Sequence, residues 1–588
     1  MAEPSIIGVR EGLVQVALGG AAAHKNEVAF VEVGDQRLQA EVLRIRGDVA
    51  ELQVFEDTRG IRRGDRVELS GELLSAALGP GLLGQVYDGL QNPLAALWTR
   101  HGTFLQRGAR VPPLDPGRRW AFEPAVANGA PVAAGQALGH VQENRIAHPV
   151  VVPFDLQGDW RLDWIDDDGS VSGDHPVAAL SGPDGARRTV SLIQRWPVRR
   201  SLGADLVRSG RAKRLYSGEP LLTGIRLIDS FFPVARGGTA CIPGPFGAGK
   251  TVLLNLIARF AQADVVVMVA CGERAGEVTE LIETFPKLAD PKSGGSLMDR
   301  TVIVCNTSAM PVSARESSIH LGATIGEYYR ALGLDVLLLA DSTSRWAQAL
   351  RETSGFMEEI PGDEAFPAYL DSSIKALYER SGIARGACGE GALSMIGTVS
   401  PAGGNLEEPV TQATLGTVKA FLGLSSERAY RRAYPAIDPL VSWSRYRDQL
   451  APWLVARLGA QWTERTGRMH DLLAEGERVA QLVAVTGEDG VTLSDYVQLL
   501  KSQLLDEAFL QQNAMDPVDA STPLPRQARL LALLDRVFAA PWRFADKEEA
   551  RARFTALTSL LRNMNLTEED SEAHGRLESE LAAQLPAS

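Results

Sequence analysis

Short apolar runs alternate with turn residues through the first part of the chain. The runs include GLVQVAL, EVAFVEV, QAEVLRI and AELQVFE, and Gly, Asp or Asn residues separate them. Short strands at regular spacing are typical of a small β-barrel or sandwich. The pattern therefore predicts an N-terminal β-barrel over residues 1–72. A Gly- and Leu-rich segment over residues 73–107 is expected to link this barrel to a domain further along the chain.

The next stretch, residues 108–195, is rich in Pro, Gly and Trp. Its sequences WAFEPAVANGAPVAAGQALGHV and VVPFDLQGDW alternate apolar and polar positions between frequent turn residues. Alternation of this kind indicates β structure, here as a compact inserted β domain. The alternative is a long surface elaboration without a function of its own.

From Thr239 the pattern changes to continuous apolar runs between helical stretches. The runs are TACIPG, DVVVMVAC, TVIVCN and DVLLLAD. Such runs predict a parallel sheet that is covered by helices on both faces. We expect this α/β domain over residues 196–440, with the linking segment joining it. From about Ser442 strands disappear and helical periodicity takes over, which predicts an α-helical domain over residues 441–588.

A glycine-rich motif, GPFGAGKT, follows the first of these buried strands. It matches G-x-x-x-x-G-K-[ST] and precedes an apolar helix, VLLNLIARF, which is the context that a P-loop needs. Its backbone N–H groups and the helix N-terminus are expected to hold phosphate. Lys250 should reach the β- and γ-phosphates, and the Thr251 hydroxyl should bind Mg²⁺. The alternative is a structural turn. The residues predicted to bind nucleotide here are Gly244, Pro245, Phe246, Gly247, Ala248, Gly249, Lys250, Thr251 and Val252.

Carboxylates follow two of the other buried strands. Asp341 ends LDVLLLAD, where a Walker B aspartate holds Mg²⁺, partly through water. Its alternative role is to cap the helix that begins at Ser342. Glu273 follows DVVVMVAC, where a carboxylate can polarise the water that attacks the γ-phosphate. The alternative for Glu273 is an exposed loop acid, and Arg274 beside it is expected to serve phosphate or subunit contacts.

Composition, charge and cysteine spacing argue against some classes of protein, and they leave the predicted domains unchanged. Hydrophobic residues make up 45% of the chain and charged residues 23%, which is ordinary for a globular protein. The net charge of −13 argues against a nucleic-acid partner. The four cysteines form no C-x-x-C pair, and no H-E-x-x-H is present, so neither a disulfide scaffold nor a transition-metal site is expected. The sequence shows no secretory signal and no apolar run of about 18 residues, so any membrane role is expected to come through partners.

Several longer motifs resemble the catalytic (A-type) subunits of V/A-type rotary ATPases. They are PLLTGIRLIDSFFP, GPFGAGKT, the GER at Glu273, ADSTSRWAQALRE, VSPAGGNLEEPVTQATL, AYPAID and QQNAMDPVD. The resemblance implies a multidomain fold: an N-terminal β-barrel, an inserted β bulge domain, a RecA-like α/β P-loop domain and a C-terminal helical domain. The bulge corresponds to residues 108–195 and separates these catalytic subunits from F-type β and non-catalytic B subunits.

The resemblance also implies roles for residues, substrate and partners. Lys250, Glu273 and Arg274 fall on catalytic positions, and Thr251 and Asp341 on magnesium positions. Arg345 falls near the nucleotide, Tyr434 against adenine, and Met515 on the second wall of the adenine pocket, where the family usually has Phe. ATP or ADP with Mg²⁺ is the implied substrate, in an alternating A3B3 ring whose B subunits supply an arginine finger. Central and peripheral stalks would join the ring to a membrane sector that moves H⁺ or Na⁺. The implied location is the cytoplasmic face of a membrane.

Departures from the family pattern keep alternatives open. Besides Met515, they include Asn405 and Leu406 in VSPAGGNL, Gly416 in TLGTVK, and Ala248 at a position where eukaryotic relatives carry a redox-active cysteine. The first alternative is a non-catalytic or divergent ring paralogue. The second is another hexameric RecA-like ATPase, of the secretion or flagellar-export type, or an RNA translocase. The inserted domain argues against this second class.

Overall fold

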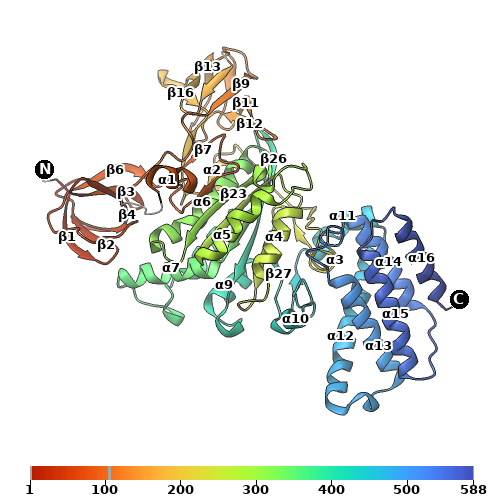
Figure 1. The fold of residues 1–588 in the computed structure, drawn as a ribbon. Coiled ribbons are helices and arrows are strands. Elements are labelled where there is room, and N and C mark those ends of the chain that lie inside the picture. Colours follow the sequence, from red (N-terminus) through yellow and green to blue (C-terminus); the bar gives the residue numbers. More distant parts are fainter. Residues whose placement is uncertain (1–2, 103–106, 168, 587–588) are drawn as a thin grey trace. The chain divides into compact units, whose positions relative to one another are not determined.

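The computed structural model describes residues 3–102, 107–167 and 169–586, which fold into two compact units. The first unit comprises Met1–Tyr216, Ala263–Val399 and Glu407–Thr417. The second comprises Ser217–Gln262, Ser400–Leu406 and Val418–Ser588. Figure 1 labels many of their elements and colours the chain from red at the N-terminus to blue at the C-terminus.

The first unit begins with a six-stranded antiparallel barrel. Its strand order is β1-β2-β5-β4-β3-β6, and a bridge between Ser5 and Arg66 joins the two edge strands. Alternate side chains of these strands, such as Val14, Val16 and Val31, are fully buried in one core. The predicted N-terminal barrel is confirmed. The strands are β1 (Ser5–Arg10), β2 (Leu13–Ala17), β3 (Glu27–Val33), β4 (Gln36–Arg46), β5 (Val49–Val54) and β6 (Val67–Leu73).

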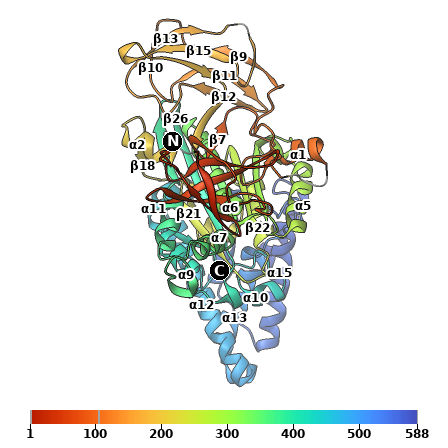
Figure 2. The same cartoon turned by 90° about the vertical axis from the view of Figure 1, so that its left-hand side faces the viewer.

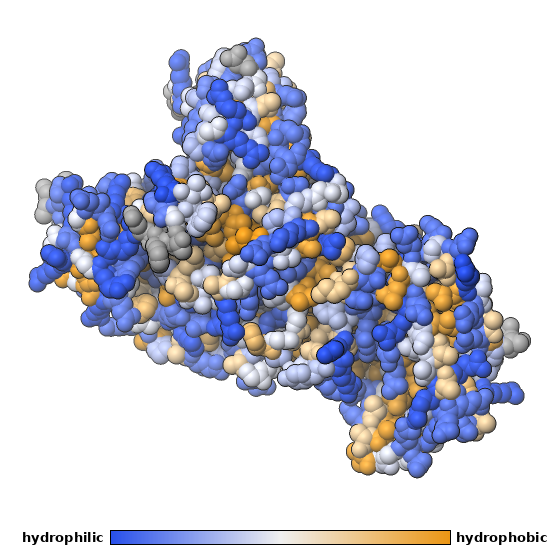
Figure 3. Space-filling model, viewed as in Figure 1, coloured by the Kyte–Doolittle hydropathy of each residue, from blue (hydrophilic) through white to orange (hydrophobic). Residues whose placement is uncertain are grey.

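The inserted β domain consists of two four-stranded sheets, ordered β10-β13-β15-β16 and β12-β11-β9-β14 (Figure 2). Trp120, Phe122 and Trp160 belong to the core that both sheets bury. The face of this domain seen in Figure 3 is mostly hydrophilic, as expected when the apolar residues are enclosed. The strands are β9 (Arg119–Pro124), β10 (Pro131–Val132), β11 (Ala137–Glu143), β12 (Ile146–Val151), β13 (Trp160–Ile165), β14 (Ser170–Ser172), β15 (Pro176–Ser181) and β16 (Arg187–Ser191).

A parallel sheet forms the centre of the first unit. Its strands run in the order β8-β23-β22-β24-β26, each parallel to the next. Strand β8 comes from the linking segment, so that segment contributes directly to the sheet. Strand β25 also pairs antiparallel with β26 and with β18. The strands are β8 (Val86–Tyr87), β18 (Lys213–Leu215), β22 (Val265–Glu273), β23 (Thr301–Thr307), β24 (Asp335–Asp341), β25 (Gly382–Gly386) and β26 (Gly389–Val399).

Helix α6 (Val312–Ala331) is buried almost all round and packs on this sheet. The remaining helices of the first unit are shorter or partly exposed. They are α1 (Leu94–His101), α2 (Leu202–Arg208), α5 (Ala275–Thr284), α7 (Thr343–Phe356), α8 (Leu370–Tyr378) and α9 (Pro409–Thr417). Two further strands, β7 (Ser75–Leu78) and β17 (Gln194–Pro197), pair antiparallel. This pairing brings the end of the inserted domain back to the chain that precedes it.

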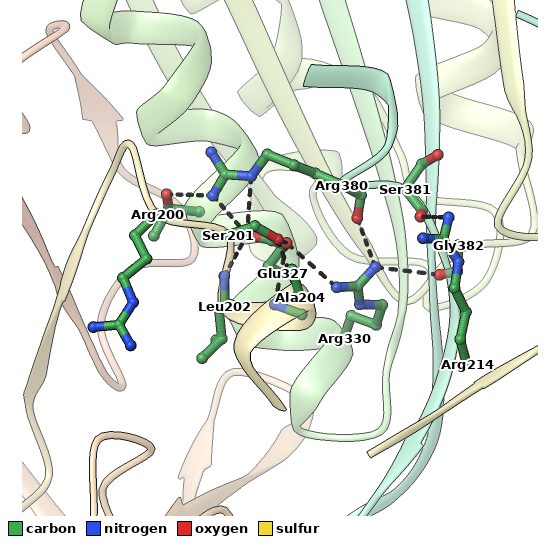
Figure 4. A network of polar contacts seen from close by, with 12 residues as sticks. Arg200, Ser201, Leu202, Ala204, Arg214, Glu327, Arg330, Arg380, Ser381 and Gly382 are labelled. Atoms are coloured by element: carbon green, nitrogen blue, oxygen red, sulfur yellow. Dashed lines mark hydrogen bonds and ion pairs between the residues drawn. The ribbon is translucent and has the colours of Figure 1, made fainter. Parts of the chain in front are cut away.

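Buried charges along α6 tie the parts of the first unit together. The Arg199 guanidinium bonds the Glu41 carboxylate of the barrel and the Glu316 carboxylate of α6, each at 2.6 Å. Further along the helix, Glu327 accepts from Arg380 Nη2 at 2.6 Å and from the Ser201 hydroxyl at 2.6 Å (Figure 4). Because buried carboxylates need such partners, these contacts fix the register of α6 against its neighbours.

The second unit contains the P-loop, a small part of sheet and the C-terminal helices. Strand β21 (Thr239–Pro243) pairs parallel with β27 (Ala420–Phe421), and β27 pairs antiparallel with β28 (Trp443–Ser444). Strand β28 lies beyond Ser442, where no strand was expected, because two residues are too short to show a period. A further hairpin is formed by β19 (Pro220–Leu221) and β20 (Val234–Ala235).

The predicted helical domain is confirmed. Arg226 of α3 is 1% exposed and anchors this domain, since it bonds Asp519 at 2.6 Å and the Phe509 carbonyl at 2.6 Å. None of the helices in the part of the chain that the structure describes is long and apolar enough to span a bilayer. The helices of this unit are α3 (Arg226–Phe231), α4 (Lys250–Phe260), α10 (Ser426–Tyr430), α11 (Arg447–Leu458), α12 (Trp462–Thr486), α13 (Leu493–Leu505), α14 (Leu524–Ala539), α15 (Lys547–Asn565) and α16 (Glu572–Gln584).

Candidate nucleotide site

The P-loop connects β21 to α4, as its sequence context predicts. Gly247 and Gly249 have φ values of 81° and 84°, which only glycine adopts without strain. The Lys250 ammonium donates to the carbonyls of Gly244 at 2.7 Å and Pro245 at 3.2 Å. The loop therefore folds around its own lysine at the N-terminus of α4, which is the arrangement that receives phosphate. Thr251 and Val252 lie in the first turn of that helix, Phe246 is exposed and Ala248 is buried.

Tyr434 lies beside the P-loop in the same unit. A Cβ atom at Gly249 would lie 3.8 Å from Tyr434 Cε2. Burial raises the pKa of the Tyr434 hydroxyl well above its ordinary value. The structure thus brings Tyr434 to the loop, whereas the Met515 side chain is 86% exposed. In this structure Met515 does not wall a closed pocket.

The predicted acidic residues meet in the first unit. Glu273 and Asp341 end the neighbouring parallel strands β22 and β24, where Ala270 pairs with Asp341. Burial, the Asp341 charge and the Glu277 charge raise the pKa of Glu273 to about 7, while Arg345 on α7 acts in the opposite direction. A bound cation would offset the negative charge that raises this pKa. The donor set therefore fits Mg²⁺, the hard cation expected from the sequence.

Asp341 is 5% exposed and accepts a hydrogen bond from Thr398 Oγ1 at 2.7 Å. This hydroxyl holds one carboxylate oxygen of Asp341 in place. Thr398 lies at the end of β26, the next strand of the sheet, and the sequence patterns did not point to it. The reasoning that singled out Asp341 could also have singled out Thr398, because the carboxyl ends of parallel strands share one edge of the sheet.

The residue before Glu273 is confined by two arginines. Gly272 has a φ of 72°, and a Cβ atom there would lie 2.9 Å from Arg345 Cβ and 3.0 Å from Arg315 Cδ. Only glycine fits, so the close approach of these arginines sets the position of Glu273. Arg274 follows as the exposed N-cap residue of α5. Gly272 is the first residue of the GER motif, but the motif did not indicate this close packing, and Arg315 lies in none of the motifs that the sequence analysis singled out.

Among the described residues no group of three or more His, Cys, Asp or Glu side chains could hold a metal ion by itself. A magnesium site here would therefore depend on hydroxyl, phosphate and water oxygens as well as on carboxylates. Such a mixed set is usual for Mg²⁺, which keeps several waters and binds through substrate phosphates.

Four family models match the chain, in the order of its domains. They are the ATP synthase alpha/beta family β-barrel domain over residues 11–71, the ATPsynthase alpha/beta subunit barrel-sandwich domain over 111–199, and the ATP synthase alpha/beta family nucleotide-binding domain over 224–444. The fourth is the C-terminal domain of V and A type ATP synthase, over 452–549. Fold and site thus define a P-loop nucleotide-binding protein of the ATP synthase alpha/beta class.

The relatives narrow this class to one family. The V-type ATP synthase alpha chain 1 of Treponema pallidum is 50% identical over 99% of this chain and 96% of its own length. The V-type ATP synthase alpha chain of Treponema denticola is 48% identical over 97% and 94%. The chain therefore belongs to the V-type ATP synthase alpha chains, the catalytic subunits of V/A-type rotary ATPases.

A solved structure of the ATPase EscN, from the type III secretion system of enteropathogenic E. coli, is similar in fold. It has a TM-score of 0.62, covers 90% of this chain and 100% of its own, and shares 21% identity. At that identity the likeness shows the fold alone, and it does not favour a secretion ATPase over the family defined by the more similar sequences.

Proposed function

We propose that the chain hydrolyses or synthesises ATP with Mg²⁺ and is coupled by rotation to transport of H⁺ or Na⁺, as an ion-transporting translocase. The observation that carries this proposal is the Glu273 carboxylate beside Asp341 and Arg345, at the carboxyl edge of a parallel sheet. A carboxyl whose pKa stands near 7 can take a proton from water and return it at the pH of a cell.

Each site residue has one physical task in this proposal. The loop Gly244–Val252 binds the phosphates through the backbone N–H groups of its residues other than Pro245, and Lys250 neutralises phosphate charge. Glu273 orients the attacking water and accepts its proton, while Arg345 and Arg274 balance nearby negative charge. Tyr434 and Met515 contact the base. Thr251 and Asp341 would hold Mg²⁺, which when bound neutralises charge that develops between the β- and γ-phosphates.

The proposed partners are B subunits in an alternating A3B3 ring, with central and peripheral stalks and a membrane sector reached indirectly. Leu482 and Val485, near the C-terminal end of α12, are 41% and 86% exposed. Apolar side chains also show at the lower end of the helical domain in Figure 3. Exposed apolar groups of this kind support a protein contact at this end of the helical domain. The proposed location is the cytoplasmic face of a membrane.

The domain assignment is part of the same proposal. Residues 1–72 form the barrel, 73–107 the linking segment, 108–195 the bulge, 196–440 the RecA-like domain and 441–588 the helical domain. The family models cover residues 11–71, 111–199, 224–444 and 452–549, which supports the same domains in the same order.

The decisive test is MgATP hydrolysis by the complex isolated through a tag on this chain, comparing wild type with Glu273→Gln. We expect the variant to bind nucleotide and to lose about a hundredfold or more in rate, since a general base contributes about that much. Glu280→Gln, on the exposed side of α5, is a matched control that should leave the rate unchanged. A wild-type complex that binds ATP but neither hydrolyses nor synthesises it would identify a structural paralogue instead.

A further inference from the structure

A groove with a volume of about 540 Å³ lies in the first unit, between the inserted domain and α2. Phe154 and Asp155, which follow β12, form one wall, and Arg208 and Arg211 belong to the other. In both Figure 1 and Figure 2, α2 lies below the inserted domain. Volumes of about 300 to 1,000 Å³ are typical of ligand sites, so the groove is large enough to receive part of a partner molecule.

Positive charge predominates in this groove. The carboxylate of Asp205 serves two arginines, since it contacts Arg200 Nε and lies 3.1 Å from Arg208 Nη1. The other acid of the lining, Asp155, lies 3.4 Å from Arg188. One carboxylate cannot balance two guanidinium groups. The groove therefore keeps an excess of positive charge, although the chain as a whole has a net charge of −13.

Arg211 is the cation of the groove with the fewest partners. Its Nη1 donates to the Phe154 carbonyl at 3.4 Å, and it forms no ion pair with any residue that the structure describes. The side chain is only half-buried. A guanidinium carries five N–H donors in a planar fork, which suits bidentate contact with a carboxylate. Arg211 can therefore accept such a contact from a partner without giving up an existing ion pair.

The surface extends beyond the wide part of the groove. A narrow second cavity, of about 20 Å³, shares Phe154 and Arg211 with the groove and reaches Ala384 of β25. The two hollows thus form a continuous path from α2 to β25. Such a path fits an extended occupant better than a compact one.

A further cation without an acidic partner lies next to this path. Lys213 of β18 pairs directly with Arg385 of β25, and both side chains are exposed. Like charges placed opposite each other across a sheet are destabilising. Arg385 has Glu390 at 2.9 Å, whereas Lys213 forms no ion pair within the described parts of the chain. A carboxylate supplied by a partner would offset this repulsion.

We propose that this groove binds an acidic, extended segment of a partner polypeptide in the assembled complex. Carboxylates of that segment pair with Arg211 and Lys213, and its backbone follows the path past Phe154 to β25. Asp155 and Asp205 stand among the cations. A compact polyphosphate would be repelled by these acids, whereas a polypeptide can place carboxylates at the cations and uncharged groups at the acids.

Binding of a labelled peptide of six glutamates to the full chain, followed by fluorescence anisotropy, tests the proposal. Arg211→Gln combined with Lys213→Gln should weaken binding by about tenfold, the worth of one charge-assisted hydrogen bond. Arg119→Gln combined with Lys25→Gln is the matched control, because both residues are exposed and lie outside the groove. Equal weakening in the two double variants would mean that the peptide senses only overall charge, which would overturn the proposal.

A small anion is the alternative occupant, and competition distinguishes it. With the P-loop saturated by MgADP, tripolyphosphate should bind the chain more weakly than the glutamate peptide does. Tighter binding of tripolyphosphate, lost in the Arg211→Gln and Lys213→Gln double variant, would identify a site for compact anions instead of a polypeptide.

Cross-linking provides a second test, in the assembled complex. A carbodiimide joins a lysine to a carboxylate in contact with it, so it should link Lys213 to an acidic residue of another subunit. Lys213→Arg keeps the charge and should remove this link. A Lys213 that links to no other subunit, or only to a second copy of this chain, would contradict the proposal. The peptide test requires neither the ring nor hydrolysis, so its result is independent of the outcome for Glu273→Gln.

Discussion

The carboxylate of Glu143 and the Nδ1 atom of His148 lie 2.6 Å apart, each on a side chain that is only 1% exposed. His148 Nε2 in turn lies 2.7 Å from the Tyr328 hydroxyl of α6, and Glu143 Oε1 accepts from the Gly81 and Leu83 backbone. One buried acid thus joins the inserted domain to the linking segment and, through His148, to the central helix. These directional hydrogen bonds hold the inserted domain against the linking segment and α6. Substitutions of the residues that form them test whether they stabilise the fold.

Replacing Glu143 with Gln removes the negative charge from this buried group. We expect the variant to lose about 3 kcal/mol in free energy of unfolding, because a buried pair that loses one partner is left uncompensated. Urea denaturation of the isolated chain measures the effect. Glu123→Gln is the matched control, since Glu123 forms a similar pair with His140 at 3.1 Å on exposed side chains. The control should change stability by less than about 1 kcal/mol. Equal effects in both variants would contradict the anchoring role.

The same carboxylate should make stability depend on pH in acid. Burial alone would raise the pKa of Glu143, but the His148 hydrogen bond and charge and the Leu83 and Gly81 N–H groups outweigh it, so the pKa is lowered. A carboxyl whose folded pKa lies below its unfolded value of about 4.3 stabilises the fold above that value. The stabilisation is lost as the pH falls through the folded pKa. Unfolding free energies of wild type should therefore converge with those of Glu143→Gln below about pH 4. A gap that stays constant throughout the acid range would refute this.

Gly272→Ala should move Glu273 without changing its chemistry. The added Cβ meets Arg345 and Arg315, and the backbone there has a positive φ. We expect ATP hydrolysis by the complex to fall by about a hundredfold with nucleotide affinity retained, as misplacement of a reacting group by about 1 Å can cost that much. Gly276→Ala, further along in α5, has open space around it and should keep the wild-type rate.

Thr398→Val removes the hydroxyl that donates to Asp341 and keeps the shape of the side chain. The concentration of Mg²⁺ needed for half-maximal hydrolysis should rise by about tenfold, since partners that orient a metal ligand typically contribute that much affinity. Thr398→Ser restores the hydroxyl and should restore the magnesium dependence. A variant that loses rate but keeps its magnesium dependence would show that Thr398 acts on something other than the metal.

Local patterns were sufficient to predict the elements and the motifs that sit on them. The P-loop could be placed because glycines, strand and helix are adjacent in the sequence, and Glu273 and Asp341 because each ends an apolar run. Strand β28 was missed because two residues have no period. The contacts of His148 could not be predicted, since they join segments that are distant in the sequence and meet only after the inserted domain packs against α6.

Arg199 sits between Glu41 of the barrel and Glu316 of α6, and its loss would leave each buried acid short of a partner, although Glu316 would keep His320 at 3.4 Å. During divergence, a substitution at one of these three positions therefore favours substitutions at the other two. A lineage that replaces the arginine by an uncharged residue is expected to replace Glu41 as well, and to keep Glu316 only together with His320. In an alignment of many related sequences, substitutions at these three positions should therefore be correlated. That correlation could be detected from the sequences alone.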